Sequence, residues 1–187
     1  MKYKTQSLKK YLDDLSAKLA APGGGSAAAL NAAMAASLIS MVVNFTLGKE
    51  KYALYQAELK AILAKSERLR NDLLDLVDLD VLVYQSKDLR KSMDVPFMLA
   101  RLTLQAAQLC LPLIKKGNVN LISDVGTAAV MLESSFVSAR FNVEINLKAL
   151  QNKVLSQKIN KELNQINKEI VRIRKDTEVA VGKIIRG

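Results

Sequence analysis

Three consecutive glycines, Gly23, Gly24 and Gly25, stand directly before an alanine-rich run in APGGGSAAAL. Consecutive glycines can hold several backbone N–H groups around one concave surface, and the N-terminus of a helix adds positive potential. Such a turn can bind an anion or a polarised oxygen; a plain tight turn before a helix fits the pattern equally well. No Lys-Ser or Lys-Thr follows and no strand precedes, which excludes a Walker A loop and a dinucleotide-binding fingerprint.

The composition limits which side chains can carry chemistry. Histidine is absent from the 187 residues, which leaves carboxylates, lysines, tyrosines and backbone dipoles, so we expect neither a catalytic metal nor a cofactor. The single Cys110 cannot form an internal disulfide, and the N-terminal residues lack the apolar core of a signal peptide. We therefore expect a cytoplasmic protein.

The formal net charge of +10 predicts an anionic partner, such as a phosphate, a polycarboxylate, nucleic acid or a membrane surface. Much of the excess falls in residues 148–187, which contain no aromatic residue. Because nucleic-acid sites usually combine basic groups with stacking aromatics, we favour a solvated helix face over a nucleic-acid site.

The spacing of apolar residues at steps of three and four, with only three prolines, predicts an all-α fold. We expect one domain over residues 1–187, a bundle of about six helices around a long Ala-rich helix. Expected starts are Ser7, Ser26, Asp94 with Pro96 in the first turn, and Ser123 or Asp124. The expected helices end near residues 20, 47, 91, 116, 150 and 187, with Gly48 and Gly117 as stops.

The second predicted helix, residues 26–47, has no charged residue and is long enough to cross a bilayer. Its many Ala and Ser residues, with Asn31 and Asn44 among them, favour instead the central helix of a packed bundle or dimer, with no membrane partner.

Polar and small residues follow one line along each of two predicted helices, at about 100° per residue. The first line contains Ser26, Ala33, Ser37, Ser40 and Asn44; the second contains Asp124, Ala128, Ser135, Ser138, Asn142 and Asn146. Close helix packing explains such lines, since small residues let backbones approach. Alternatively, their upper ends line a cleft whose mouth is formed by the two capping turns.

Four motifs occur in order: PGGGS at 22–26, MVVNFTLGKEKY at 41–52, KGN at 116–118 with SDVG at 123–126, and NVEINL at 142–147. Together they closely resemble the formiminotransferase-cyclodeaminase family, in particular its cyclodeaminase domain and the stand-alone bacterial cyclodeaminase/cyclohydrolase relatives. The resemblance implies an all-α homodimeric enzyme acting on one-carbon tetrahydrofolate. It implies either closure of formiminotetrahydrofolate with loss of ammonia, or hydrolysis of methenyltetrahydrofolate to the 10-formyl form.

The resemblance extends to an acidic segment, LVDLDVLVY at 76–84, in which Asp80 and Tyr84 share a helix face. We expect Asp80 to transfer the proton, with a raised pKa in a dry cleft; an ordinary exposed carboxylate is the alternative. Asp124, either a helix-start residue or a second proton-transfer group, and Lys49, facing the glutamate tail or developing charge, complete the catalytic candidates. The expected substrate-binding residues are Gly23, Gly24, Gly25, Ser26, Asn44, Tyr84, Gly117, Asn118, Ser123 and Asn142.

These expectations rest on two helix starts, the triple-Gly turn and the Asp124 turn, converging on one slot for a tetrahydrofolate, including polyglutamylated forms. One departure from the family is the short segment SKDLRKSMDVP at 86–96, and another is Asn31 and Ala35 in place of glycines. Either departure is compatible with an altered substrate or a lost activity. The short segment supports an alternative, a catalytically silent helical dimer that binds folate or a protein partner. A basic nucleic-acid-binding bundle is the third hypothesis.

Overall fold

The computed structural model describes residues 2–187. All regular elements among them are helices and none is a strand, so the all-α prediction is confirmed. The long elements are α1 (Leu8–Ser16), α2 (Gly24–Asn44), α3 (Gln56–Ser86), α4 (Leu89–Ala107), α5 (Cys110–Lys116), α6 (Ile122–Leu150) and α7 (Lys153–Arg186). Short 3-10 turns are η1 (Tyr3–Thr5), η2 (Glu50–Tyr55) and η3 (Val119–Leu121).

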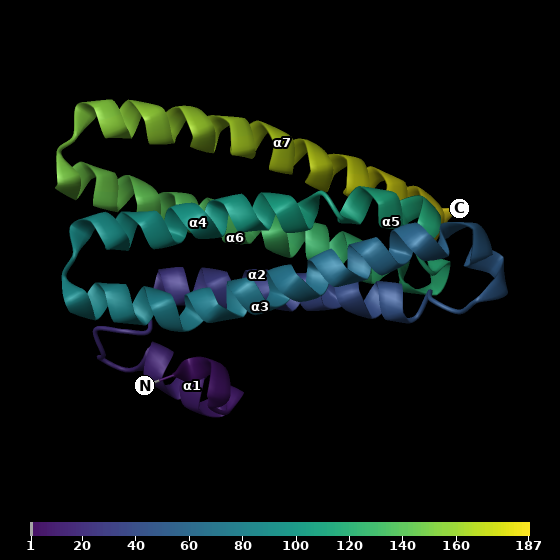
Figure 1. Cartoon of the computed structure of the whole chain (residues 1–187), viewed down its shortest axis with the longest axis horizontal. Helices are drawn as coiled ribbons and strands as arrows, with labels where there is room; N and C mark the ends of the chain where they lie inside the picture. The colour runs from purple at the N-terminus through teal and green to yellow at the C-terminus, as the bar shows by residue number, and fades with distance from the viewer. Residues whose placement is uncertain (1) are drawn as a thin grey trace.

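Four helices form the bundle that carries the site. Helix α2 packs between α3 and α6, and α4 packs against the same two helices from the other side, while α7 runs along α6 and α4 (Figure 1). On α2, Ala32, Ala35 and Ala36 have no exposed surface. Their small side chains let α3 and α6 approach the α2 backbone closely, so the Ala-rich helix is central, as predicted.

Several predicted helix boundaries are confirmed and others are wrong. Ser7 caps α1, its Oγ accepting the Lys10 N–H at 3.1 Å, although α1 already ends at Ser16. Gly117 follows α5 as expected. Ser26 is not the cap of α2: the helix begins two residues earlier, with Gly23 as N-cap, and Ser26 lies buried in its first turn.

Helix α4 begins earlier than predicted because Asp88, not Asp94, caps it, accepting the Lys91 N–H at 3.0 Å. Pro96 therefore lies inside the helix, where its missing N–H leaves the Ser92 carbonyl without its helical donor. The side chain of Asn146 on α6 supplies that donor, with Nδ2 at 2.8 Å from the Ser92 oxygen.

The predicted helix 94–116 is in fact two helices, α4 and α5, with a break at residues 108 and 109. Pro112, four residues after Gln108, cannot donate to the Gln108 carbonyl, so the helical hydrogen-bond pattern is interrupted there.

Three helical stretches are long and apolar enough to cross a membrane by length and composition: Gly24–Asn44, Leu89–Lys116 and Val119–Leu150. Within the bundle, 61%, 50% and 39% of their apolar windows are buried. Packing against neighbouring helices thus accounts for much of their apolar character.

Candidate active site

A cavity of about 580 Å³ lies where α2 begins, α3 ends, α4 begins and α6 ends. It is lined by Ala20, Ala21, Gly23, Gly24, Gly25, Asp80, Val83, Tyr84, Lys87, Leu89, Ser92, Asn142, Ile145, Asn146 and Ala149. Six of the residues predicted from the sequence meet here: Gly23, Gly24, Gly25, Asp80, Tyr84 and Asn142.

Asp80 on α3 lies directly against the first turn of α2. A Cβ added to Gly25 would stand 2.8 Å from Asp80 Cγ and 3.0 Å from its Oδ2, so only glycine permits this approach. Burial raises the pKa of Asp80, and a hydrogen bond from the Ser26 backbone N–H opposes that rise. A carboxyl group with a raised pKa is a stronger base than an ordinary Asp, so it is better able to accept a proton and then return it.

The start of α2 adds hydrogen-bond donors to the same wall. Gly23 provides no side-chain cap, and the first N–H groups of any α-helix have no partner within the helix. The N–H groups of Gly24 and Gly25 therefore suit an anionic or polarised oxygen beside Asp80, where the helix dipole adds positive potential.

Two asparagines of α6, Asn142 and Asn146, form the wall next to Gly24. Asn142 donates from Nδ2 to the Ser138 carbonyl at 2.8 Å, and Asn146 donates from Nδ2 to the carbonyls of Asn142 and Ser92, both at 2.8 Å. Since these bonds use the amide nitrogens, each Oδ1 is available to accept from a bound ligand, and among residues 2–187 neither accepts a hydrogen bond. The wall thus suits a flat ligand with N–H donors.

The last turn of α3 and the residue that follows it form a further part of the cavity lining. Tyr84 is 57% exposed, so its ring is already accessible for stacking on a flat ligand in the cavity. Lys87, in a left-handed conformation at the end of α3, is the one cationic side chain among the described residues that line the cavity. Its ammonium group suits an anionic part of a ligand.

The N-terminal segment is hydrogen-bonded to α2 and α3 close to Asp80. Tyr11 on α1 donates to Ser26 Oγ at 3.1 Å, and Ser26 Oγ donates to the Val77 carbonyl on α3 at 3.0 Å. Asp78, buried two residues before Asp80, accepts the Tyr3 N–H through Oδ1 at 2.5 Å. Ser26 is therefore a structural link between α1, α2 and α3, and with no exposed surface it does not line the cavity as predicted.

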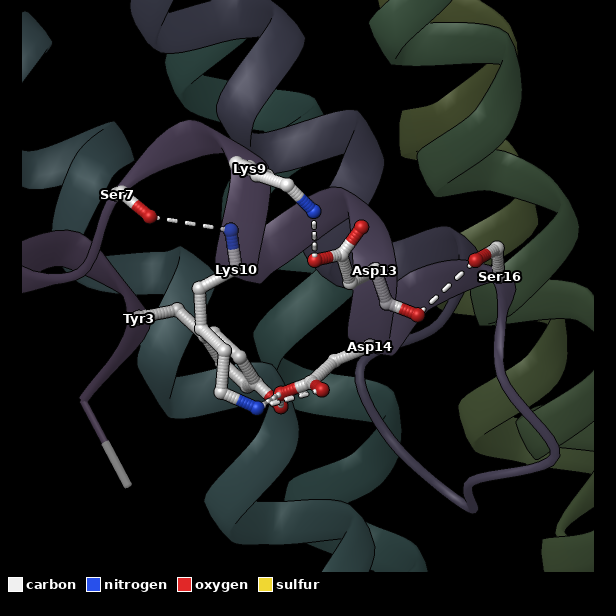
Figure 2. A network of polar contacts seen from close by, with 7 residues as sticks. All are labelled: Tyr3, Ser7, Lys9, Lys10, Asp13, Asp14 and Ser16. Carbon is white, nitrogen blue, oxygen red and sulfur yellow. Dashed lines mark hydrogen bonds and ion pairs between the residues drawn. The ribbon is translucent and has the colours of Figure 1, made fainter.

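The same segment has its own polar network (Figure 2). Tyr3 donates to Asp14 Oδ2 at 2.9 Å, and Lys10 pairs with both oxygens of Asp14 at 2.7 Å. Hydrogen bonds from Lys10 and Tyr3 hold the pKa of Asp14 below its usual value. The rings of Tyr3 and Tyr11 meet edge to face, with centroids 5.4 Å apart, so η1 and α1 are joined to each other as one unit.

The remaining predicted site residues lie at the opposite end of the bundle. Helices α2 and α6 run antiparallel: Gly24 faces Asn142 near the end of α6, whereas the Asn118 N–H reaches Thr46 Oγ1, at 2.9 Å, near the end of α2. The prediction that both helix starts meet in one slot is therefore wrong within a single chain. The residues placed away from the cavity are Asn44, Lys49, Gly117, Asn118, Ser123 and Asp124.

Gly117 and Asn118 have structural roles at the opposite end of the bundle from the cavity. A Cβ on Gly117 would come within 2.6 Å of the Leu113 carbonyl oxygen and 3.2 Å of Val42 Cγ1. Asn118 is buried and also donates from Nδ2 to the Phe45 carbonyl at 3.3 Å. Both residues thus join the end of α2 to the start of α6.

Three polar residues of the cavity were not among the predicted site residues: Lys87, Ser92 and Asn146. Asn146 follows Asn142 by four residues in the NVEINL motif, so helical spacing was a usable signal. No sequence signal marked Lys87 and Ser92, because their position in the cavity depends on where α3 ends and α4 begins.

Comparison with known proteins identifies the family. The formiminotransferase-cyclodeaminase family model matches residues 7–87 and 85–165. The chain therefore belongs to this family, as the four motifs predicted. The two matched parts meet at the turn between α3 and α4, at the start of the segment 86–96 that the resemblance marks as short.

Individual similar proteins support the same family assignment. The chain is 33% identical to methenyltetrahydrofolate cyclohydrolase of Methylorubrum extorquens, over 84% of this chain and 87% of that protein. It is 28% identical to formimidoyltransferase-cyclodeaminase of Rattus norvegicus, of which it spans only 34%. The crystal structure of formiminotetrahydrofolate cyclodeaminase from Thermotoga maritima superposes with a TM-score of 0.93 at 27% identity, covering 97% of this chain and 98% of that one.

Proposed function

We propose that this protein is a folate one-carbon enzyme that acts on the carbon between nitrogens 5 and 10 of tetrahydrofolate. The relatives supply the substrate class, since they are named as a methenyltetrahydrofolate cyclohydrolase and a formiminotetrahydrofolate cyclodeaminase. The observation that carries the proposal is the Asp80 carboxyl, with its raised pKa, set against the donor-rich first turn of α2 inside a cavity.

One proton-transfer cycle at Asp80 serves either reaction. In hydrolysis, Asp80 takes a proton from water as the oxygen bonds to the cationic methenyl carbon, and gives it to nitrogen 5 as that carbon–nitrogen bond breaks. The remaining hydroxyl proton leaves to solvent as the formyl C=O bond forms, so that one proton is released overall. In cyclodeamination, Asp80 takes the proton of nitrogen 10 as it attacks the formimino carbon, and gives it to the departing ammonia. Both pass through a tetrahedral carbon, so both need the same base and acid at one position.

The other walls of the cavity suit the rest of such a substrate. In this proposal the side-chain oxygens of Asn142 and Asn146 accept hydrogen bonds from pterin N–H groups, and the pterin stacks on the Tyr84 ring; the presence of all three residues in the cavity lining supports it. Lys87 offers a charge partner for a glutamate carboxylate. Polyglutamylated substrates, a homodimer and a cytoplasmic location belong to the same proposal.

Two parallel assays with the purified protein test the function. Methenyltetrahydrofolate absorbs in the near ultraviolet, so hydrolase activity removes this absorbance, whereas deaminase activity on formiminotetrahydrofolate produces it. The faster of the two reactions identifies the physiological one. If neither rate exceeds the uncatalysed background while folate still binds, the protein is the silent binder and the enzymatic proposal is wrong.

A further inference from the structure

The first turn of α2 approaches Asp80 so closely that a small shift of either would change the site. A Cβ added to Gly25 would lie 2.8 Å from Asp80 Cγ, so the two helices leave no spare room at this point. Gly23, the N-cap residue, has no side chain to accept the first N–H groups of α2, and the Ser26 N–H hydrogen-bonds the Asp80 carboxylate instead. Whatever fixes this turn against α3 therefore also fixes Asp80.

The Ser26 side chain fixes the turn to α3 at a second point. Its Oγ donates to the Val77 carbonyl at 3.0 Å. Val77 precedes Asp80 by three residues, so the two groups lie on successive turns and on the same side of α3. Ser26 thus contacts α3 both through its backbone, at Asp80, and through its side chain, at Val77.

Tyr11 of α1 holds the Ser26 hydroxyl in this orientation. The Tyr11 hydroxyl donates to Ser26 Oγ at 3.1 Å, and the single hydroxyl proton of Ser26 goes to Val77. Ser26 has no exposed surface and Tyr11 is 4% exposed, so water does not compete for either bond. Loss of the Ser26 hydroxyl would therefore leave the buried Tyr11 hydroxyl without its partner.

Among residues 2–187, no charged side chain holds Asp80 in place. The cavity-lining residues from α2, α4 and α6 are uncharged, and the nearby Asp78 binds the backbone of η1. The titratable groups around Asp80 are Lys87 and Tyr84, which line the cavity, and Tyr11, whose pKa is raised mainly by burial and also by the charge of Asp80. None of these three side chains hydrogen-bonds the Asp80 carboxyl group, which leaves the turn of α2 to position it.

We propose that Ser26 and Tyr11 are positioning residues of the site: their hydrogen bonds hold the first turn of α2 against α3 and so fix Asp80 relative to the substrate. Neither residue lines the cavity, and both act through Asp80. The link to catalysis rests on the proposed function, in which Asp80 transfers the proton, whereas the hydrogen bonds themselves do not. By this proposal α1 is a functional part of the site although it does not reach the cavity.

A double variant separates positioning from stability. In Ser26→Ala the buried Tyr11 hydroxyl has no acceptor, so the melting temperature is expected to be lower than that of wild type. Ser26→Ala/Tyr11→Phe removes both partners, and Ala favours a helix over Ser, so the double variant is expected to melt no lower than Tyr11→Phe alone. If Ser26 served stability only, kcat/KM would recover together with the melting temperature.

We expect instead that kcat/KM of the double variant stays about tenfold or more below wild type, mainly through kcat. A displacement of about 1 Å at a reacting group costs about 100-fold, and loss of the Ser26 hydroxyl frees the turn by a fraction of that distance. The shift also weakens the Ser26 N–H bond that lowers the pKa of Asp80, so the acid midpoint of kcat/KM is expected to move to higher pH. Wild-type kcat/KM with an unmoved midpoint in the double variant would overturn the proposal.

Ser40→Ala/Ser66→Ala is the matched control. The two hydroxyl oxygens, 2.8 Å apart, also join α2 to α3, and both residues are buried. Ser40 lies fourteen residues after Ser26, about 21 Å further along α2 and outside the cavity lining. Wild-type kcat/KM and an unmoved acid midpoint are expected. A loss as large as that of the Ser26 variants would show that any loosening of α2 on α3 lowers activity, and would overturn the specific role of Ser26.

Thermal melting tests the same contact without reference to activity. The difference in melting temperature between Asp80→Asn and its Asp80 parent grows as pH rises through the folded-state pKa of Asp80. In the Ser26→Ala/Tyr11→Phe background this growth is expected to continue to a higher pH than in the wild-type background. If the wild type turns over neither folate, the proposed function fails and this measurement still decides the role of Ser26. An identical pH dependence in the two backgrounds would overturn the positioning of Asp80.

Discussion

Gly25→Ala is the change for which the structure predicts the sharpest outcome. The added Cβ would stand 2.8 Å from Asp80 Cγ, whereas non-bonded carbons separate by about 3.5–4.0 Å, so the carboxyl group must retreat by about 1 Å. A displacement of about 1 Å at a reacting group costs about 100-fold in rate. We therefore expect kcat/KM to fall about 100-fold.

The same substitution should not weaken the fold. Ala favours a helix over Gly by up to about 1 kcal/mol, and the clash involves one short side chain that can rotate toward the cavity. The melting temperature, followed by far-ultraviolet circular dichroism, is expected to be unchanged or higher. Activity is followed by the change in near-ultraviolet absorbance of the folate.

Gly24→Ala is the matched comparison, because its Cβ would meet only Asn142 Nδ2, at an ordinary 3.9 Å. We expect it to lose far less activity than Gly25→Ala. Equal losses in the two variants, or full activity in Gly25→Ala, would refute the argument that close approach of Asp80 to α2 sets the reaction geometry.

Further predictions concern Asp80 and the segment behind it. Asp80→Asn is expected to lower kcat by about 100-fold or more in the folate assay. Because burial raises the folded-state pKa of Asp80, the free energy of unfolding falls as pH rises through that pKa and the carboxyl group ionises. Asp80→Asn is therefore expected to have a higher melting temperature than wild type at neutral pH. This difference is expected to vanish below the ordinary Asp pKa. For the same reason, wild-type kcat/KM is expected to decrease as pH is lowered, with a midpoint above the ordinary Asp pKa. A midpoint at the ordinary Asp pKa would contradict a dry environment around Asp80. Asp78→Ala leaves the buried Tyr3 N–H unpaired and is expected to lower the free energy of unfolding by about 1–3 kcal/mol in a urea titration; no change would show that the N-terminal segment is not anchored there. Tyr11→Phe is expected to cost about 1 kcal/mol in the same titration, through loss of its hydrogen bond to Ser26, with an unchanged midpoint showing that this bond adds no stability.

The sequence was sufficient to predict the fold class and the site residues around the glycine turn. Apolar spacing gave the helices, and the glycine turn, Asp80 and Asn142 were found because each is marked by local pattern or by a family motif. Helix starts were less predictable. Ser26 has the side chain of a cap, yet its hydroxyl is used by Tyr11 and Val77, so Gly23 takes the cap position.

By itself the sequence determined that the chain is an α-helical bundle of the formiminotransferase-cyclodeaminase family with a glycine turn before its central helix. Only the tertiary structure decided which motifs share a site. Helical period fixes the face on which a residue lies but not the direction in which two helices run past each other. Because α2 and α6 pack antiparallel, the Gly23 and Asp124 ends lie at opposite ends of the bundle, and Asp80 meets Gly25 instead.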